Sequence, residues 1–420
     1  MQEAALAANT AHRDVILLSA TGSGKTLGFL LPVLQLLNPA LKTTQALVIV
    51  PSRELALQIE QVFKSMGTYL KVTCCYGGHL RETEENNLLQ APALIIGTPG
   101  RLADHIRRGN ITTDTIETLV LDEFDKTMEL GFHEELQFII SSLPSLKKHI
   151  LTSATDTTDI PDFIKLENPE KLNFLSDTDH LSESLAIWSV QAGLKEKEEA
   201  LFDLICYLGN RSTIVFCNHR DLVEDISAML TDKGVTSVYY HGSMEQQERD
   251  AALCKFRNGS SNILITTDLA SRGLDIPNIR YIIHFHLPEN EQTFIHRNGR
   301  TARMEASGTA ILLLGSDEKI PAFVQGKVEK KKMPAENIIP ERPKWSTLFI
   351  GAGKKDKVNK IDIVGFFSNI GQLKKEDIGL IEVKDFFSFV AIKKIKVGNV
   401  IQLIKDQKIK NKKVKIEMAK

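Results

Sequence analysis

The sequence has few cysteines, and they show no arrangement that suggests a cross-link or a metal site. None of the five forms a Cys-x-x-Cys pair, and their odd number and spacing argue against a disulfide framework and against zinc. Several lie in apolar, strand-like runs, where a buried and unreactive thiol is the expected state. We therefore expect reduced cysteines in a reducing compartment.

Long hydrophobic runs are also missing, and so is a secretion signal. No apolar stretch approaches the ~20 residues that cross a bilayer. The first residues lack the basic flank and the apolar core of a signal peptide. We therefore expect a cytoplasmic protein without a membrane partner, and we take it to be a monomer.

The chain as a whole carries almost no excess charge, since its formal net charge is −1, but its last part does. Residues 344–420 contain 18 lysines and 8 acidic residues, so they carry a net charge of +10 and leave −11 on residues 1–343. A basic end on an acidic body suggests a polyanionic partner. A lysine-rich solvated face is the alternative interpretation.

Short apolar segments alternate with helical segments along the first 155 residues. The apolar segments are nearly continuous in Val, Ile and Leu, as parallel strands must be when both faces of their sheet are buried. This alternation predicts a doubly wound α/β domain over residues 1–167. The predicted strands are 15–19, 46–50, 72–76, 94–98, 119–122 and 150–153, and the predicted helices are 26–37, 53–66 and 100–108.

The alternation begins again near Leu185, after a polar linker over residues 168–184, and predicts a second α/β domain over residues 185–325. A charged and proline-spaced tether over residues 326–345 follows it. Residues 346–420 then read in the β-α-β-β-α-β order of a ferredoxin-like α+β domain. The strands predicted in the second domain are 213–217, 238–241, 263–267, 281–285 and 310–314, with helices such as 222–230 and 246–256.

A glycine-rich loop separates the first predicted strand from the helix that follows it, and it reads Ser19-Ala-Thr-Gly-Ser-Gly-Lys-Thr26. Such a loop points backbone N–H groups at phosphates, and glycine lets the backbone approach them closely. We expect Lys25 to reach the β- and γ-phosphates and the Thr26 hydroxyl to ligate Mg²⁺. An ordinary strand-to-helix turn is the alternative. The expected nucleotide-binding residues of the loop are Thr21, Gly22, Ser23, Gly24, Lys25 and Thr26.

A run of acidic residues, Asp122-Glu123-Phe-Asp125, comes directly after another predicted strand. We expect Asp122 to hold Mg²⁺ through water and Glu123 to orient and activate the attacking water. For The loop and the acidic run, in this order, predict a nucleotide-driven machine.

Further motifs follow in a characteristic order, and with them the chain resembles the DEAD-box RNA helicases of superfamily 2 over residues 2–325. This resemblance implies two RecA-like domains and an RNA-dependent ATPase that uses ATP and Mg²⁺ and locally unwinds short RNA duplexes. The matching motifs are Pro51-Ser-Arg-Glu-Leu-Ala56, Gly77-Gly78, Thr98-Pro-Gly-Arg101, Ser153-Ala-Thr155, Thr267-Asp-Leu-Ala-Ser-Arg-Gly-Leu-Asp275 and His296-Arg-Asn-Gly-Arg-Thr-Ala-Arg303.

The resemblance also implies roles for individual residues. Gln2 would read the adenine of ATP and Asp275 would bind its ribose, while Arg300 and Arg303 would act as arginine fingers beside Lys25, Asp122 and Glu123. A surface ion pair is the alternative role for Arg272. The coupling of hydrolysis to strand separation would use Ser153, Thr155 and His296, and the RNA backbone would meet Arg53, Gly78, Thr98, Arg101, Thr267 and Arg272.

Some letters depart from the family pattern. Phe124 stands where the family has Ala, and Asn298 and Ala302 stand where it usually has Ile and Gly. The chain also begins at Met1-Gln2, without the aromatic and Pro-Thr segment that precedes this glutamine in the family. We therefore expect weakened adenine stacking, and either a truncated chain or a misassigned start codon.

The last domain resembles the C-terminal RNA-binding domain of the DbpA subfamily, an RRM variant, through Phe349-Ile-Gly-Ala-Gly-Lys-Lys-Asp-Lys357 and Asp362-Ile-Val-Gly365. Phe387 and Phe389 either stack on bases or fill the core. The subfamily targets a hairpin of large-subunit, 23S-type ribosomal RNA, which implies a ribosomal large-subunit precursor as partner. Phosphate contacts are expected from Lys354, Lys355, Lys357, Lys393, Lys394 and the run 408–415.

Other functions stay open beside the helicase. An ATP-gated RNA clamp or chaperone with little unwinding shares every motif. A DNA helicase is a further alternative, although Ser153-Ala-Thr155 and the RRM-like domain favour RNA. A catalytically dead, truncated product is a lesser possibility.

Overall fold

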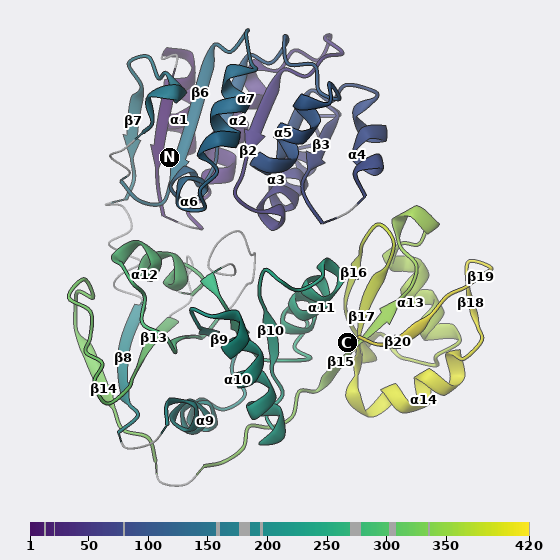
Figure 1. Cartoon of the computed structure of the whole chain (residues 1–420). Coiled ribbons are helices and arrows are strands. Elements are labelled where there is room, and N and C mark those ends of the chain that lie inside the picture. Colours follow the sequence, from purple (N-terminus) through teal and green to yellow (C-terminus); the bar gives the residue numbers. More distant parts are fainter. Residues whose placement is uncertain are drawn as a thin grey trace. The chain divides into compact units, whose positions relative to one another are not determined.

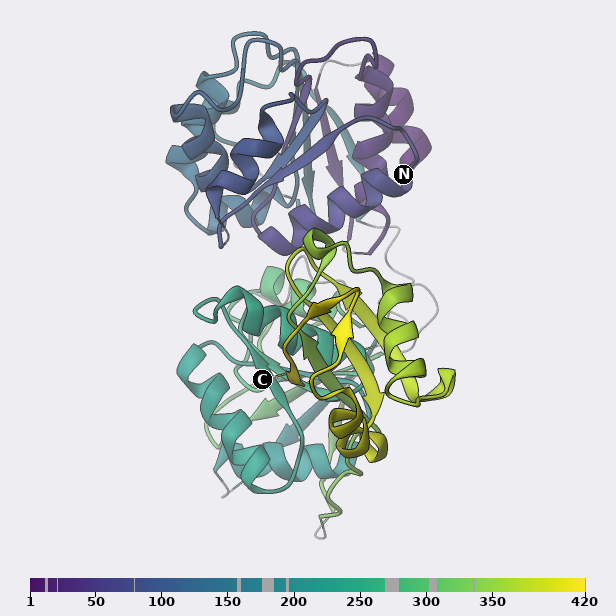
Figure 2. The ribbon, with the colours of Figure 1, turned by 90° about the vertical axis from the view of Figure 1, so that its right-hand side faces the viewer.

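The computed structural model describes residues 1–11, 14–20, 22–78, 80–156, 160–175, 185–193, 196–268, 279–301, 308–334 and 337–419 (Figures 1 and 2). These residues form two compact units, which divide between residues 175 and 185. Each unit is described by itself.

The first unit is a parallel sheet with the strand order β3-β4-β2-β5-β6-β1-β7, covered by helices on both faces (Figures 1 and 2). Its strands are β1 (Val15–Leu18), β2 (Ala46–Ile49), β3 (Val72–Cys75), β4 (Leu94–Gly97), β5 (Thr118–Leu121), β6 (Lys148–Ser153) and β7 (Glu170–Asn173). Its helices are α1 (Gln2–Ala11), α2 (Lys25–Leu36), α3 (Arg53–Ser65), α4 (Arg81–Leu88), α5 (Pro99–Arg107), α6 (Phe124–Glu129) and α7 (His133–Ser141), with a 3₁₀ turn at Asp162–Ile164.

The second unit begins with another parallel sheet, of order β10-β11-β9-β12-β13-β8-β14. Its strands are β8 (Leu185–Gln191), β9 (Thr213–Phe216), β10 (Val238–Tyr240), β11 (Ile263–Thr266), β12 (Tyr281–His284), β13 (Gly308–Leu314) and β14 (Val328–Lys331). Its helices are α9 (Lys197–Leu208), α10 (Arg220–Asp232), α11 (Gln246–Arg257) and α12 (Glu291–Asn298).

The predicted fold class is confirmed by these two parallel sheets, which place strands at every predicted segment. Two edge strands, β7 and β14, lie inside the segments interpreted as linkers, which is a difference from the sequence prediction. Both are polar and only half-buried, because an edge strand exposes one side to solvent and needs no continuous apolar run.

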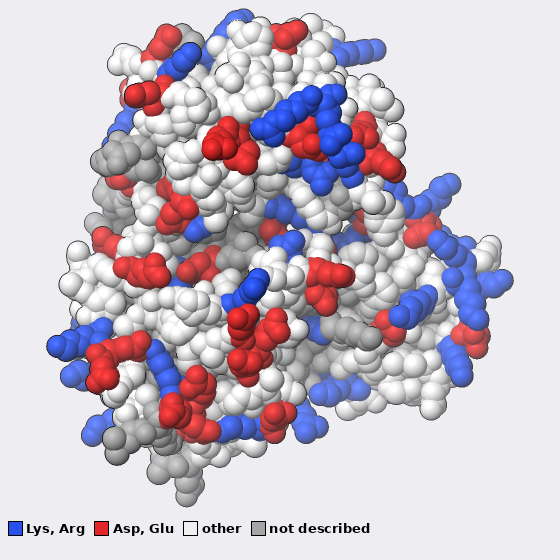
Figure 3. Space-filling model, in the orientation of Figure 1, with Lys and Arg blue, Asp and Glu red and all other residues white. Residues whose placement is uncertain are grey.

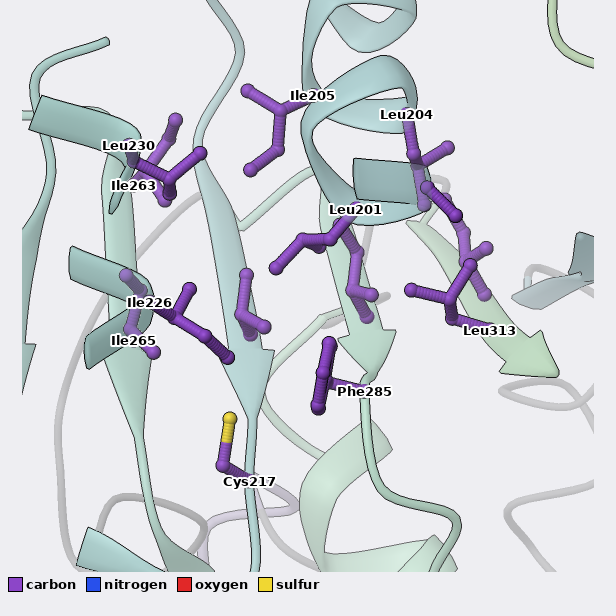
Figure 4. Close-up of a cluster of buried hydrophobic side chains, with 14 of the residues drawn as sticks. Leu201, Leu204, Ile205, Cys217, Ile226, Leu230, Ile263, Ile265, Phe285 and Leu313 are labelled. Atoms are coloured by element: carbon purple, nitrogen blue, oxygen red, sulfur yellow. The ribbon is translucent and has the colours of Figure 1, made fainter. Parts of the chain in front are cut away.

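The core of this second sheet contains Leu201 and Leu204 of α9, Ile226 of α10 and Phe285 after β12, all buried (Figure 4). The thiol of Cys217 lies in the same core, and burial raises its pKa to about 12. All five cysteines are free thiols, and all but the half-buried Cys74 are buried. The expectation of reduced, unreactive cysteines agrees with this burial.

The last part of the second unit is an antiparallel sheet of order β16-β17-β15-β20 with two helices packed on one face (Figure 2). The predicted β-α-β-β-α-β order is confirmed, and a short lysine-rich hairpin, β18–β19, is added to it. The elements are β15 (Trp345–Ile350), α13 (Lys360–Asn369), β16 (Ile378–Val383), β17 (Ser388–Lys393), α14 (Lys394–Ile404), β18 (Lys408–Ile409), β19 (Lys412–Lys413) and β20 (Ile416–Met418), with 3₁₀ turns at Lys354–Asp356 and Lys375–Asp377.

Among the residues that the structure describes, none of the helices combines the length and the apolar character that a membrane crossing needs.

Candidate functional site

The glycine-rich loop connects β1 to the start of α2 and has a backbone that only glycine adopts easily. Gly22 and Gly24 have φ angles of 82° and 91°. A Cβ atom on Gly24 would lie 2.5 Å from Nε2 of Gln2, which donates a hydrogen bond of 3.4 Å to the Gly24 carbonyl. The structure therefore brings Gln2 and the loop together. Thr21 lies outside the described residues.

The rest of the loop is held by its serines. Ser23 Oγ donates to the Ala20 carbonyl at 2.7 Å and also contacts Ser19 Oγ. Lys25, the first residue of α2, is buried, and Thr26 beside it is half-buried. The sequence places both at a helix N-terminus, where backbone N–H groups and the helix dipole favour an anion.

Asp122 and Glu123 lie buried just after β5. Asp122 Oδ1 accepts a hydrogen bond from the Glu123 amide at 3.1 Å and another from the Thr152 hydroxyl on β6. Burial raises the pKa of Asp122, although the nearby Lys25 ammonium and the Thr152 hydroxyl lower it in part. Glu123 has a left-handed backbone, with φ of 48°, a strained conformation that recurs at functional sites.

Two of the predicted motifs meet at Asp125. Thr155 Oγ1 donates to Asp125 Oδ2 at 3.1 Å, and the Thr155 amide donates to Ser153 Oγ at 3.1 Å. Asp125 Oδ1 also accepts from the amide of Lys126 at 2.9 Å, so it is both a helix-end acceptor and a link between motifs. Phe124 packs in the core cluster of the unit, which accommodates this departure from the family pattern.

The predicted RNA-contact residues of the first unit lie on three loops. Arg53 begins α3, and its guanidinium lies 4.6 Å from the ring centre of Tyr76. Gly78 has a φ of 91°, and Thr98 directly precedes α5, which carries Arg101. An open groove of about 670 Å³ is lined by residues that include Gly77, Leu80, Arg81, Thr98, Arg101 and Phe132.

In the second unit, α12 carries the sixth motif, and Arg297 anchors it. The Arg297 guanidinium donates to both carboxylate oxygens of Asp268, at 2.6 and 2.9 Å, and to the His286 carbonyl at 2.7 Å. Arg297 is 1% exposed, and the sequence analysis gave it no role. The only sequence signal was its place inside the motif, which suits a structural anchor as well as a catalytic group.

Asn298, a departure from the family pattern, has a specific partner. His284 Nε2 donates to Asn298 Oδ1 at 3.1 Å, and the His284 ring stacks between Phe216 and Phe294. Burial, followed by the charge of Arg297, lowers the pKa of His284 to about 3, so this histidine is neutral.

Other predicted residues of this unit vary in how the structure places them. His296 and Arg300 are buried, and Thr267 is half-buried at the end of β11. Three predicted residues and one departure from the family pattern lie outside the described residues: Arg272, Asp275, Arg303 and Ala302.

The aromatic face of the C-terminal sheet packs against α11. Phe389 is fully buried and clusters with Phe349, Phe387 and, from α11, Ala251 and Cys254. The face lies opposite the domain's own helices, because alternate residues of β17 point to opposite sides of the sheet. Burial of Phe389 is therefore observed, but against the neighbouring domain rather than in the domain's own core. Base stacking on Phe389 is incompatible with this packing.

Polar contacts extend the same interface. Asn258 Nδ2 donates to Thr347 Oγ1 at 2.8 Å, and the Thr347 hydroxyl donates to Ser260 Oγ at 2.9 Å. Arg257 pairs with Glu382 at 3.3 Å. These contacts connect the loop after α11 to the antiparallel sheet.

The predicted phosphate-binding lysines remain at the surface. Lys354, Lys355 and Lys357 are exposed in and after the 3₁₀ turn of this domain. Lys410 pairs with Asp362 at 2.9 Å, and Lys412 pairs with Asp356. Blue side chains gather along the edge of the domain that carries the β18–β19 hairpin (Figure 3).

Comparison with known proteins connects these features to one family. The sequence pattern of the "DEAD/DEAH box helicase" family matches residues 1–163, that of the "Helicase conserved C-terminal domain" matches residues 196–305, and that of the "DbpA RNA binding domain" matches residues 347–418. The ATP-dependent RNA helicase DbpA of Escherichia coli (strain K12) is 32% identical, over all of this chain and 94% of its own length. The chain belongs to the DbpA-like DEAD-box RNA helicases.

Other members of the DEAD-box family agree with this assignment. The ATP-dependent RNA helicase DbpA of Bacillus subtilis (strain 168) is 29% identical, over all of this chain and 94% of its own length. Among solved structures, S. cerevisiae Dbp5 bound to RNA and ADP BeF3 matches with a TM-score of 0.68 and 26% identity, over 79% of this chain and 88% of Dbp5. The DEAD-box chain described here is therefore an ATP-dependent RNA helicase that binds ATP and RNA.

Proposed function

We propose that this helicase hydrolyses ATP beside the buried pair Asp122 and Glu123. The observation that carries this proposal is the connected cluster in which Asp122 is bonded to Thr152 and influenced by the charge of Lys25. Lys25 would bind the β- and γ-phosphates, and Glu123 would orient and activate the attacking water. The glycine loop provides the N–H groups for the phosphates, and Ser23 helps to hold its shape.

The residues of the site also fit Mg²⁺. The Asp122 carboxylate and the Thr26 hydroxyl are hard oxygen donors, which Mg²⁺ prefers, and we propose that they hold it, Asp122 through water. When bound, the ion neutralises phosphate charge. Lys25 adds a fixed positive charge on the same side of the sheet.

The remaining nucleotide contacts are proposed from the family pattern. Gln2 would read adenine, a role supported by its contact with Gly24. Asp275 would bind the ribose, and Arg300 and Arg303 would stabilise charge on the transferring phosphoryl group. Arg297 holds the helix that precedes Arg300, through its paired bonds to Asp268.

Coupling between hydrolysis and RNA would pass through Asp125. Its hydrogen bond with Thr155 joins the acidic motif to the Ser153-Ala-Thr155 motif, so a change at the phosphate is transmitted to the loop after β6. We propose that His296 takes part on the second unit. Binding of ATP and RNA then favours one conformer by tighter binding, and hydrolysis releases it.

We propose that the RNA substrate is ribosomal RNA of the large-subunit precursor, recognised by the lysines of the C-terminal domain. Exposed Lys354, Lys355 and Lys357 support this proposal, together with the net charge of +10 on residues 344–420. In a binding assay at ~150 mM salt, we expect tighter binding to the 23S-type hairpin than to an unrelated stem-loop of equal length. Equal affinity for both RNAs would remove the ribosomal part of the proposal.

Unwinding itself is tested by strand displacement. We expect ATP-dependent release of the short strand from a duplex attached to the hairpin, with RNA rather than DNA as the activator of hydrolysis. Slow hydrolysis without strand release would instead identify an ATP-gated RNA clamp. Equal activation by DNA would identify a DNA helicase.

A further inference from the structure

Glu84 lies at the centre of a buried hydrogen-bond network in the first unit. Its side chain is 1% exposed. Oε1 accepts from the Tyr76 amide at 2.8 Å, while Oε2 accepts from Arg101 Nη1 at 3.1 Å and from His105 Nε2 at 2.7 Å. The carboxylate on α4 therefore joins the loop after β3 to helix α5.

The segments joined in this way are those proposed to contact RNA. Tyr76 immediately precedes Gly77-Gly78, and its ring lies against the guanidinium of Arg53. Arg101 is the last residue of the Thr98–Arg101 motif. Gly77, Thr98 and Arg101 all line the open groove of this unit. One buried carboxylate thus supports three RNA-contact segments from behind.

The protonation of the network is well defined by its hydrogen bonds. Asn110 Nδ2 donates to His105 Nδ1 at 3.1 Å, which leaves the His105 Nε2–H to donate to Glu84. Bonds to an ionised carboxylate are stronger than neutral ones, and burial away from water strengthens them further. Loss of the carboxylate charge would therefore loosen Arg101 and Tyr76 together.

We propose that Glu84 is a positioning residue that holds Arg53, the Gly77-Gly78 turn and Arg101 in the arrangement that binds one RNA strand. This inference rests on the proposed RNA contacts of those three segments. Glu84 itself is buried behind them, so it acts on RNA only through Tyr76 and Arg101.

A metal site is the competing explanation of the same cluster. Ligand atoms of Cys75, Glu84 and His105 lie within 4.8 Å of one another. However, hydrogen-bond donors already engage Glu84 and His105, and burial, followed by the charge of Glu84, raises the pKa of the Cys75 thiol far above its usual range. A protonated thiol is a poor metal ligand. Stoichiometric zinc in the purified protein would overturn the proposal.

The test is the RNA dependence of ATP hydrolysis in Glu84→Gln. We expect the RNA concentration for half-maximal stimulation to rise about tenfold, since a charged hydrogen bond is lost. The rate at saturating RNA should stay within about twofold, because the ATP site is untouched. The matched control is Glu85→Gln, which removes the same charge from the same helix at a half-exposed position paired with Arg81, and should change little.

A double-mutant cycle separates positioning from general destabilisation. In an Arg101→Ala background, Glu84→Gln should cost clearly less RNA affinity than it does alone, because part of its effect passes through Arg101. Additive effects would overturn the proposal. If Glu84→Gln fails to fold, Asn110→Ala loosens the same network through His105 and should shift the RNA dependence about two- to threefold in the same direction. No shift in that variant would overturn the proposal.

The outcomes also distinguish this inference from the proposed function. If Arg101→Ala alone leaves the RNA dependence unchanged, the proposed RNA contact at Arg101 is wrong. If Arg101→Ala weakens RNA stimulation and Glu84→Gln does not, the RNA contact stands and the role of Glu84 is wrong.

Discussion

The buried pair of His284 and Asn298 makes the stability of the second unit depend on pH. The pKa of His284 is lowered from 6.5 to about 3, first by burial and then by the charge of Arg297. Below pH 6.5 the unfolded chain binds a proton at this histidine that the folded chain does not bind. The stabilisation is therefore complete above pH 6.5 and is lost as the pH falls toward 3.

The magnitude follows from the size of this pKa shift. One pKa unit corresponds to about 1.4 kcal/mol, so acidification from about pH 7.5 to about pH 5 should lower the free energy of unfolding by about 2 kcal/mol through His284 alone. Replacement of His284 by Phe keeps a ring between Phe216 and Phe294 but does not titrate. Asn298→Leu must accompany it, because the Asn298 amide would otherwise lose its partner.

The assay is urea unfolding of the whole chain, followed by the fluorescence of Trp188 in a Trp345→Phe background. The chain has two tryptophans, and Trp188 packs against the core of the second parallel sheet. Other groups also titrate, so the quantity of interest is the difference between parent and the His284→Phe/Asn298→Leu variant. We expect the variant to lose about 2 kcal/mol less than the parent on acidification. An equal loss in both proteins would refute the reasoning.

Three further predictions concern other contacts. Thr155→Val removes the hydrogen bond to Asp125, and we expect strand displacement to fall at least about tenfold more than RNA-stimulated ATP hydrolysis does, measured on the same duplex. Phe389→Ala leaves a cavity at the contact with α11 and should lower the free energy of unfolding by about 3 kcal/mol, measured in urea. Burial opposes ionisation of Asp14, yet hydrogen bonds from His149 and a backbone amide outweigh it and hold its pKa below 3.8. Stability at this site is therefore present above pH 3.8 and lost below it, and Asp14→Asn should flatten the acid limb of a thermal unfolding profile.

The fold follows from the sequence where strands are buried on both faces. Residues 46–50 and 94–98 are continuous apolar runs, and they form the neighbouring central strands β2 and β4. The edge strands β7 and β14 could not be read in the same way, because their pairing satisfies the backbone while their side chains stay polar and half-exposed. What covers Phe389 was equally hidden, since alternation defines a face but not its neighbour.

The site shows the same division. Lys25 and Asp122 stand in short motifs whose spacing carries their chemistry, so the sequence predicts them as candidates. Glu84 was missed because its partners Arg101 and His105 lie 17 and 21 residues away, and only the packing of α4 on α5 brings them together. Arg297 was missed as an anchor because its acceptor Asp268 lies 29 residues away on another segment.

Steady-state ATP hydrolysis by Glu123→Gln, with and without ribosomal RNA, tests the central claim most directly. Glu129→Gln is the control, since it removes the same charge from the surface of α6. We predict that RNA stimulates the parent and the control alike, and that Glu123→Gln loses roughly a hundredfold or more of the stimulated rate. Undiminished turnover in Glu123→Gln would contradict the assignment of the hydrolytic site.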